Sequence, residues 1–322
     1  MRDDFLDRIN AWQQAAEERL AENFHSARPL VQEIGRYILA SSGKRLRPIL
    51  YLLAVELCGR KDKRDELHSA IFEMVHSASL LHDDVIDEAA TRRGRPAANQ
   101  NWDNRAVVLA GDHLFARSFT LCAETGNIEV IRVMAECTAQ LVEGQVLELE
   151  YQFNLETPYQ VYLEIITAKT AVLLAAAARI GAIMAGVPAA KEEALHCFGK
   201  DLGVAFQIID DLLDWAGDEE VVGKPVGQDL REGKATLPWI HALVQAPEAT
   251  RQRMLKAASG QISDKDFAWL RQSVEELGGL EAARNEAESF KEKAKAHLDI
   301  FEDSPPRQLI LDLADYVCRR RL

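Results

Sequence analysis

The chain has 322 residues with a net charge of −13 at pH 7, and 48% of its residues are hydrophobic while only 7% are aromatic. This length allows one large domain or two ordinary ones, and the composition allows a sizeable aliphatic core. The acidic balance argues against a protein whose main partner is nucleic acid.

Targeting and redox signals are absent from the sequence. Five cysteines lack a CxxC pair and regular spacing, which favours a reducing compartment over a disulfide framework or a zinc site. The stretch MRDDFLDRINAWQQ is amphipathic and acidic, unlike a signal or transit peptide. The most apolar run, 171–187, is rich in alanine and contains Arg179, which is typical of a helix buried in a soluble bundle. We therefore expect a soluble cytoplasmic protein with no transmembrane segment.

Helical patterns follow one another along the chain. Residues 5–24 and 29–42 carry apolar side chains at steps of three and four, which predicts amphipathic helices. Thr157-Pro158 predicts the start of another helix, and Gly186 followed by Pro188 predicts its end. Loops are short, and we find neither a low-complexity linker nor a fixed-period repeat. The sequence therefore predicts a single all-α domain over 1–322.

Three aspartates cluster in the segment SLLHDDVIDEAATRRGRP, which runs from Ser79 to Pro96. Because helical residues four apart share a face, Asp83 and Asp87 should lie on one stripe with Asp84 beside them. Carboxylates at this spacing repel one another unless a cation lies between them. By itself the cluster fits a solvated helix end as well as a metal site.

A second cluster with the same spacing changes this balance. The segment GVAFQIIDDLLDWAGD places Asp210, Asp211 and Asp214 after another apolar stretch. Two DDxxD copies, each ending a hydrophobic helix, suit several Mg²⁺ ions that bridge one diphosphate. There is no D-x-D-x-D-G pattern for Ca²⁺, and zinc lacks its usual ligands here.

Basic residues flank both clusters. Diphosphate recognition needs cations besides the metal, and arginine and lysine bind phosphate in complementary ways. We interpret Arg45 as a residue that decorates a turn. No P-loop and no GxGxxG is present, which argues against ATP and NAD. The candidate phosphate ligands are Lys44, Arg47, Arg92, Arg93, Lys224, Arg231 and Lys234.

His76 stands seven residues before Asp83 and therefore on nearly the same helical stripe. A lone histidine on a helix is commonly a structural hydrogen-bonding residue. Its alignment with the aspartates equally suits a ligand for an anionic substrate.

Four ordered motifs resemble those of the trans-isoprenyl diphosphate synthases, most closely the long-chain bacterial polyprenyl (octaprenyl-like) synthases. They are GKRLRP, LLHDDVIDEAATRRGRP, AKTAVLL and FQIIDDLLDWAGDEEVVGKPVGQDLREGKATLP, and the resemblance runs from about Arg36 to the end. The usual Gly-Gly-Lys opening is Ser42-Gly43-Lys44 here. The resemblance implies an all-α helical bundle of the isoprenyl synthase type around a deep central cavity, with a homodimer as the usual assembly.

The resemblance also implies roles for individual residues. Asp83 and Asp87, with Asp84 in support, would bind Mg²⁺ on the allylic diphosphate, with three Mg²⁺ ions per site. Isopentenyl diphosphate would be condensed with the allylic carbocation left when that diphosphate departs, and the proton would leave with the released diphosphate. The implied residues are Asp210, Asp211 and Asp214 for Mg²⁺ on the opposite wall, Arg92 for the allylic diphosphate, Lys44, Arg47, His76 and Arg93 for isopentenyl diphosphate, and Lys169, Thr170, Gln207, Lys224 and Lys234 for the allylic substrate or its leaving group, with Lys169 also catalytic.

Product length is implied by the positions just before the first aspartate. They are Ala78 and Ser79 here, and both are small. Bulky aromatic residues there block growth in short-chain relatives, so we expect a long all-trans product near C40. Small residues would also serve close helix packing alone, and Met134 is a candidate for the floor of the tunnel.

Other functions remain open. A shorter-chain (C15–C20) synthase differs only in product length, and a catalytic subunit of a heteromeric synthase would keep both motifs. A class I terpene cyclase would carry a different second metal motif than the DDLLD found here. A helical scaffold without activity leaves the ordered charged motifs unexplained.

Overall fold

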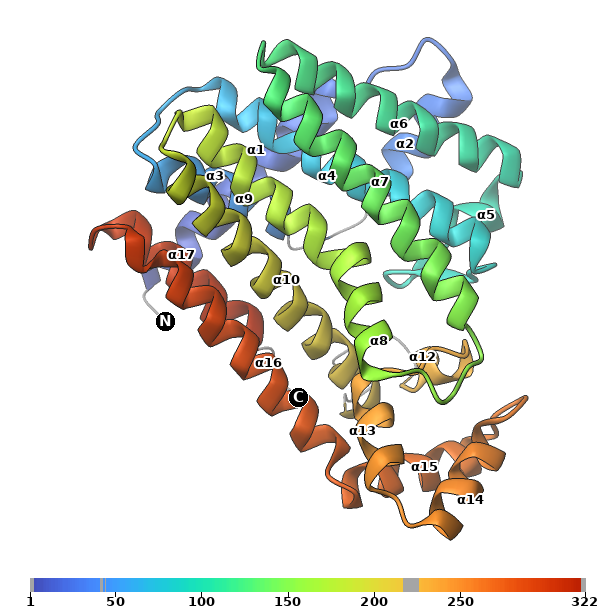
Figure 1. The fold of residues 1–322 in the computed structure, drawn as a ribbon. Coiled ribbons are helices and arrows are strands. Elements are labelled where there is room, and N and C mark those ends of the chain that lie inside the picture. Colours follow the sequence, from blue (N-terminus) through green and yellow to red (C-terminus); the bar gives the residue numbers. More distant parts are fainter. Residues whose placement is uncertain (1–2, 41–42, 44, 217–225, 320–322) are drawn as a thin grey trace. The chain divides into compact units, whose positions relative to one another are not determined.

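The protein is described by a computed structural model that covers residues 3–319 apart from 41–42, 44 and 217–225 (Figure 1). The prediction of an all-α protein is confirmed. Among these residues the only β-structure is one hairpin, whose two strands have two residues each. The helices are α1 Asp3–Asn23, α2 Pro29–Leu39, α3 Leu46–Leu57, α4 Arg64–Ile86, α5 Ala98–Asn101, α6 Asn104–Glu124, α7 Ile128–Tyr151, α8 Tyr159–Ile166, η1 Thr167–Ala171, α9 Val172–Ala185, α10 Ala189–Ala216, α12 Gln228–Arg231, α13 Leu237–Gln245, α14 Glu248–Ala258, α15 Asp264–Glu276, α16 Gly279–Ala296, η2 His297–Ile300 and α17 Pro305–Cys318, and the strands are β1 Thr91–Arg92 and β2 Arg95–Pro96.

The chain forms two compact units, each built from several chain segments. Unit 1 comprises Met1–Thr138, Leu173–Gly199 and Leu298–Asp312, and unit 2 comprises Ala139–Val172, Lys200–His297 and Leu313–Leu322. The predictions of a single domain and of a central cavity stay predictions.

Helix α4 is the core of unit 1. It packs against α1, α2, α3, α5 and α6 (Figure 1), and every side chain from His68 to Val75 is buried. A helix that is buried on all sides loses the one-sided apolar stripe of a surface helix. The polar residues at its end are therefore fixed to a rigid element.

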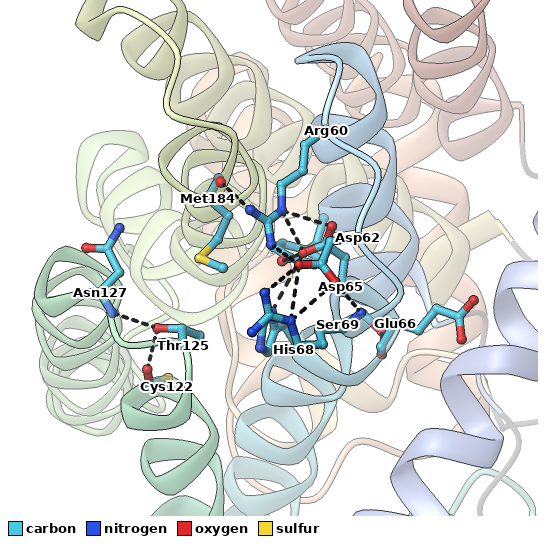
Figure 2. A network of polar contacts seen from close by, with 12 residues as sticks. Arg60, Asp62, Asp65, Glu66, His68, Ser69, Cys122, Thr125, Asn127 and Met184 are labelled. Carbon is cyan, nitrogen blue, oxygen red and sulfur yellow. Dashed lines mark hydrogen bonds and ion pairs between the residues drawn. The ribbon is translucent and has the colours of Figure 1, made fainter.

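A polar network fastens the first turn of α4, as Figure 2 shows. The Arg60 guanidinium donates to both oxygens of Asp65 at 3.0 Å and to the Met184 carbonyl at 2.9 Å. The buried Tyr51 hydroxyl donates to Asp65 at 3.2 Å, and His68 Nδ1 lies 3.7 Å from the same carboxylate. Burial opposes the charge of Asp65, but these donors outweigh it and lower its pKa.

Unit 2 has its own aromatic core. Trp215 and Trp239 stack with ring centroids 6.3 Å apart, and Phe267 lies 5.7 Å from Trp215. Each indole N–H has an acceptor: Trp215 donates to Thr236 Oγ1 at 3.0 Å and Trp239 to the Leu155 carbonyl at 2.8 Å. Because Trp215 follows Asp214 directly, this core anchors the end of α10.

The predicted helix after Pro158 is present but is not uniform. Thr157 does not cap it, since its hydroxyl donates back to the Asn154 carbonyl at 2.6 Å. Residues Thr167–Ala171 form a π-helical turn between α8 and α9. Apolar periodicity carries no signal for such a turn, and π turns are frequent at functional sites.

Two helices among the described residues are long and apolar enough to cross a membrane, Asn104–Glu124 and Tyr159–Ala185. Core helices of soluble proteins satisfy the same criteria, and 56% of the apolar window of the second is buried. The prediction of no transmembrane segment therefore stays a prediction.

The Asp65 network predicts a pH-dependent stability. Asp65→Asn should lower the free energy of unfolding at pH 7 by roughly 2 to 3 kcal/mol, because Arg60 loses a buried charged partner. The folded-state pKa of Asp65 lies below its unfolded value of about 3.9. Its stabilisation is therefore present above pH 4 and is lost as the pH falls through the folded pKa. Urea unfolding at pH 7 and at a series of pH values below about 4 measures the difference between the two proteins, which should stay constant down to about pH 4 and narrow below it.

Glu136→Gln provides the matched control, because Glu136 is an exposed carboxylate paired with Arg132. It should change the free energy of unfolding by less than about 0.5 kcal/mol. Equal unfolding midpoints for the wild type and Asp65→Asn at pH 7 would contradict the role of the network.

Candidate active site

The first aspartate cluster lies at the C-terminal end of α4. Asp83 and Asp84 belong to its last turn, and Asp87 is the C-cap residue. The C-terminal end of a helix carries partial negative charge, so it is unfavourable for three carboxylates. These residues therefore require cations nearby.

Arg92 supplies one such cation to Asp84. Its Nε and Nη2 atoms both lie 2.7 Å from Asp84 Oδ1, while the backbone N–H of Ala98 donates to Oδ2 at 3.3 Å. Asp84 is fully buried. Protein donors thus hold the Asp84 carboxylate, and this ion pair fixes Arg92 beside the cluster. The supporting role of Asp84 in metal binding stays a prediction.

The hairpin of β1 and β2 presents the two adjacent arginines. Arg92 pairs with Arg95 across the hairpin, and Arg93 and Gly94 form its two-residue turn with φ values of 52° and 73°. Positive φ at both turn residues is the feature of a type I′ turn, whose twist matches that of the strands. A Cβ built on Gly43 would lie 2.7 Å from Arg93 Nη1, so Arg93 reaches the loop before α3.

Several arginines converge on His76. Desolvation, and then the charges of Arg47, Arg93 and Arg92, hold the pKa of His76 well below its usual range. Its imidazole is therefore neutral in a strongly positive environment. Gathering these charges is unfavourable without an anion, so the group is suited to bind phosphate.

The interpretation of Arg45 as an exposed residue of a turn is wrong. It is 3% exposed and donates to Glu73 at 2.6 Å and to the Leu39 carbonyl at 2.6 Å. Its role is structural, but it acts inside the core of unit 1. The neighbouring Lys44, predicted to bind isopentenyl diphosphate, lies outside the described residues.

The two predicted chain-length residues lie on α4, between His76 and the first aspartate cluster. Ala78 is fully buried, and the Ser79 hydroxyl donates to the His76 carbonyl at 2.9 Å. Met134 on α7, the candidate floor, is also fully buried.

The second aspartate cluster lies near the C-terminal end of α10 in unit 2. Asp214 is fully buried and accepts from the backbone N–H groups of Gln228 at 3.3 Å and Asp229 at 3.1 Å. It thereby caps the short helix α12. Gly227 begins this helix with φ of 77°, and a Cβ there would lie 2.0 Å from the Phe267 ring, so only glycine fits.

A cavity of about 200 Å³ lies next to this cluster within unit 2. Among the predicted substrate ligands, Lys169, Thr170, Gln207 and Lys234 all line it, as does Asp211. Lys224, also predicted for this site, lies outside the described residues. Five of the predicted residues are thus brought together around one space.

The π-helical turn supplies two of these side chains. Lys169 and Thr170 both lie in η1, and Lys169 is ion-paired with Glu148 of α7. A Cβ on Gly144 would lie 2.5 Å from the Ala168 Cβ, so glycine permits the close approach of α7 to the turn.

Asp211 has an unusual charge balance. Burial, together with the charges of the neighbouring Asp210 and Asp214, raises its pKa to about 7, although hydrogen bonds from Tyr162 and Gln207 favour the charged form. A nearby divalent cation would favour the charged form. The all-oxygen donor set of both clusters fits Mg²⁺.

The described residues contain no group of three His, Cys, Asp or Glu side chains arranged to hold a metal by themselves. Mg²⁺ commonly keeps several waters and takes one or two carboxylates together with substrate phosphate oxygens. The donor set therefore suits metal binding shared with a diphosphate.

Sequence reasoning missed several charged or polar residues of the cavity, among them Glu148, Tyr162 and Asp229. Glu148 lies in a helix with other acidic residues, so nothing marks it locally. A buried tyrosine needs a partner for its hydroxyl, but the sequence does not say which.

Comparisons with known proteins agree with these motifs. The family model described as "Polyprenyl synthetase" matches residues 28–274. Octaprenyl diphosphate synthase of Escherichia coli is 37% identical over 94% of this chain and 93% of its own. Heptaprenyl diphosphate synthase component 2 of Geobacillus stearothermophilus is 36% identical over 95% of each chain.

Solved structures are similar over nearly the whole chain. A decaprenyl diphosphate synthase from Rhodobacter capsulatus is 40% identical, with a TM-score of 0.91 over 98% of both chains. A polyprenyl synthase from Caulobacter crescentus, complexed with calcium and isoprenyl diphosphate, is 36% identical, with a TM-score of 0.92 over 99% of this chain and 98% of the other.

The chain therefore belongs to the polyprenyl synthetase family, and the resemblance noted in the sequence is confirmed. It has the isoprenyl synthase fold. It is an enzyme, a prenyltransferase of the polyprenyl diphosphate synthase class.

Proposed function

We propose that this enzyme condenses isopentenyl diphosphate with an allylic diphosphate to give a long-chain all-trans polyprenyl diphosphate near C40 and diphosphate. The observation that carries the proposal is the group of arginines around the neutral His76, adjacent to the carboxylates that end α4. Cations and carboxylates side by side suit a metal-bound diphosphate.

Mg²⁺ is the proposed cofactor, with three ions per site held through Asp83, Asp84, Asp87, Asp210, Asp211 and Asp214. Two observations support it: the carboxylates at the unfavourable end of α4 and the buried carboxylate of Asp211 on the wall of the unit 2 cavity. Bound Mg²⁺ supplies positive charge against the departing diphosphate.

The side chains then divide the remaining work. Arg92, Lys169, Thr170, Gln207, Lys224 and Lys234 bind the allylic diphosphate, and their donors stabilise the charge that accumulates as its C–O bond ionises. Lys44, Arg47, His76 and Arg93 bind isopentenyl diphosphate and orient its double bond for attack on the carbocation. The proton lost from the product goes to the released diphosphate, so no side-chain base is required.

A long product is supported by the small side chains at Ala78 and Ser79, which would obstruct a growing chain less than the aromatic residues of short-chain relatives. The relatives named above make products of different length, from heptaprenyl to decaprenyl. We place the product near C40 within this range.

A homodimer is supported by an exposed apolar stripe on α7 and the residues after it. Val142, Val146 and Leu149 are 61%, 48% and 44% exposed, and their spacing of four and three places them on one face of α7. Phe153, two residues after the end of α7, is 70% exposed. Such a patch marks an interface, and we propose that a second copy of this chain covers it in the cytoplasm.

The first experiment incubates the purified protein with isopentenyl diphosphate, farnesyl diphosphate and Mg²⁺ and resolves the products by length. We expect a ladder ending near C40 and no product in EDTA. Asp83→Asn and Asp210→Asn should each lower kcat at least about a hundredfold, since each removes charge that stabilises the leaving diphosphate.

The two variants combined should lose less than the product of their separate effects, because both act on one leaving group. Products ending at C15 or C20 would instead indicate a short-chain synthase. No product from folded protein with any allylic primer would indicate a missing partner subunit.

Product length should depend on the room beside α4. Ala78→Phe and Ser79→Phe should shorten the longest product by several isoprene units, because an aromatic ring would block the growing chain. The product ladder measures this. Ser79→Phe keeps the test decisive if Ala78→Phe, at a fully buried position, does not fold.

Ile86→Phe is the control on the same helix, because Ile86 is 44% exposed. It should leave the ladder unchanged. A wild-type ladder from both test variants would refute the proposed tunnel.

The apolar stripe predicts a second measurable change. Val146→Glu should raise the dissociation constant of the dimer at least about a hundredfold, because an unpaired charge would be buried. Sedimentation equilibrium measures the constant. Val244→Glu, at a 75% exposed position on α13, should leave it unchanged, and a monomeric wild type would end the proposal.

A further inference from the structure

Tyr162 forms a buried hydrogen bond that the proposed mechanism does not use. Its hydroxyl donates to Asp211 Oδ2 at 2.6 Å, and it is 3% exposed on the wall of the unit 2 cavity. We propose that Tyr162 is a positioning residue that holds the Asp211 carboxylate in the orientation needed for Mg²⁺ and diphosphate. This inference rests on the proposed function and deepens it.

The opposite oxygen of Asp211 is held by a second chain of hydrogen bonds. Gln207 Nε2 donates to Oδ1 at 2.8 Å, and Thr170 Oγ1 donates to Gln207 Oε1 at 2.7 Å. Because Thr170 engages the amide oxygen, the amide nitrogen of Gln207 is directed at Asp211. Each carboxylate oxygen therefore has one protein donor, and its remaining lone pair stays available for a cation.

The residues of the hydrogen-bond network around Asp211 come from three elements. Tyr162 belongs to α8, Thr170 to the π-helical turn and Gln207 to α10. All four residues line the same cavity as Lys169 and Lys234. A carboxylate that accepts a hydrogen bond at each oxygen cannot rotate freely, and restricting this rotation is the role of outer-shell hydrogen bonds around metal ligands.

Stability alone gives no reason for this arrangement. Burial of Asp211 is unfavourable by itself, and well-packed apolar residues in such a place are commonly as stable or more stable. Tyr159, on the same helix, makes a comparable bond to Glu286 at 2.7 Å. Tyr159 does not line the cavity, so it offers the same chemistry without the proposed function.

Tyr162→Phe and the control Tyr159→Phe therefore separate positioning from stability. The primary readout is the Mg²⁺ concentration that gives half of the rise in melting temperature caused by inorganic diphosphate, which needs no turnover. We expect Tyr162→Phe to raise this concentration about tenfold and to lower kcat by a similar factor. Tyr159→Phe should change neither, while both variants melt within a few degrees of each other without ligand.

A second pair of variants tests the other arm of the network. Thr170→Val removes the hydroxyl at constant volume and should also raise the required Mg²⁺ concentration, whereas Thr170→Ser keeps the donor and should restore most of the loss. This pair keeps the proposal testable if Tyr162→Phe does not fold.

Wild-type Mg²⁺ dependence in Tyr162→Phe would overturn the proposal. So would a loss of melting temperature far beyond that of Tyr159→Phe together with unchanged Mg²⁺ dependence. If the wild type binds Mg²⁺ with diphosphate but makes no prenyl product, the proposed function fails, while the binding readout still decides the role of Tyr162.

Discussion

The concentration of negative charge at the ends of two buried helices is the constraint to which the surrounding structure responds. Each cluster places three carboxylates near a helix C-terminus, where the backbone itself is negative. The protein neutralises part of this charge with its own groups, including Arg92 for Asp84 and backbone N–H groups for Asp214. The carboxylate oxygens of both clusters also suit cations that arrive with the substrate.

The arginines around His76 concentrate positive charge in the same way that the two clusters concentrate negative charge. The arginines around His76 raise the cost of any further positive charge, which is why the imidazole stays neutral. Two arginines of this region pair with buried carboxylates, Arg45 with Glu73 and Arg92 with Asp84. An anion with several oxygens would relieve the repulsion among the others at no cost in reorganisation, because rigid elements already hold them.

Local patterns could be predicted from the sequence, and long-range pairs could not. The helices and the two DDxxD clusters follow from spacing, since these signals lie within a few turns of one helix, while the grouping of Lys169, Thr170 and Gln207 follows from the resemblance to the family. The bond from Tyr162 to Asp211 joins residues 49 positions apart, and no periodicity encodes it. Arg45 looked like a surface residue because its partner Glu73 lies on another helix.

The cap formed by Asp214 has a consequence for how relatives of this chain are compared. Its carboxylate serves the backbone of α12, a task that asparagine or serine also performs well at helix starts. A relative with asparagine or serine at this position would keep the cap of α12, whereas an apolar residue there would remove it. Loss of this aspartate to an apolar residue in a relative would therefore disturb the start of α12 as well as the proposed metal site, so reduced activity in such a relative would not by itself identify a lost metal ligand.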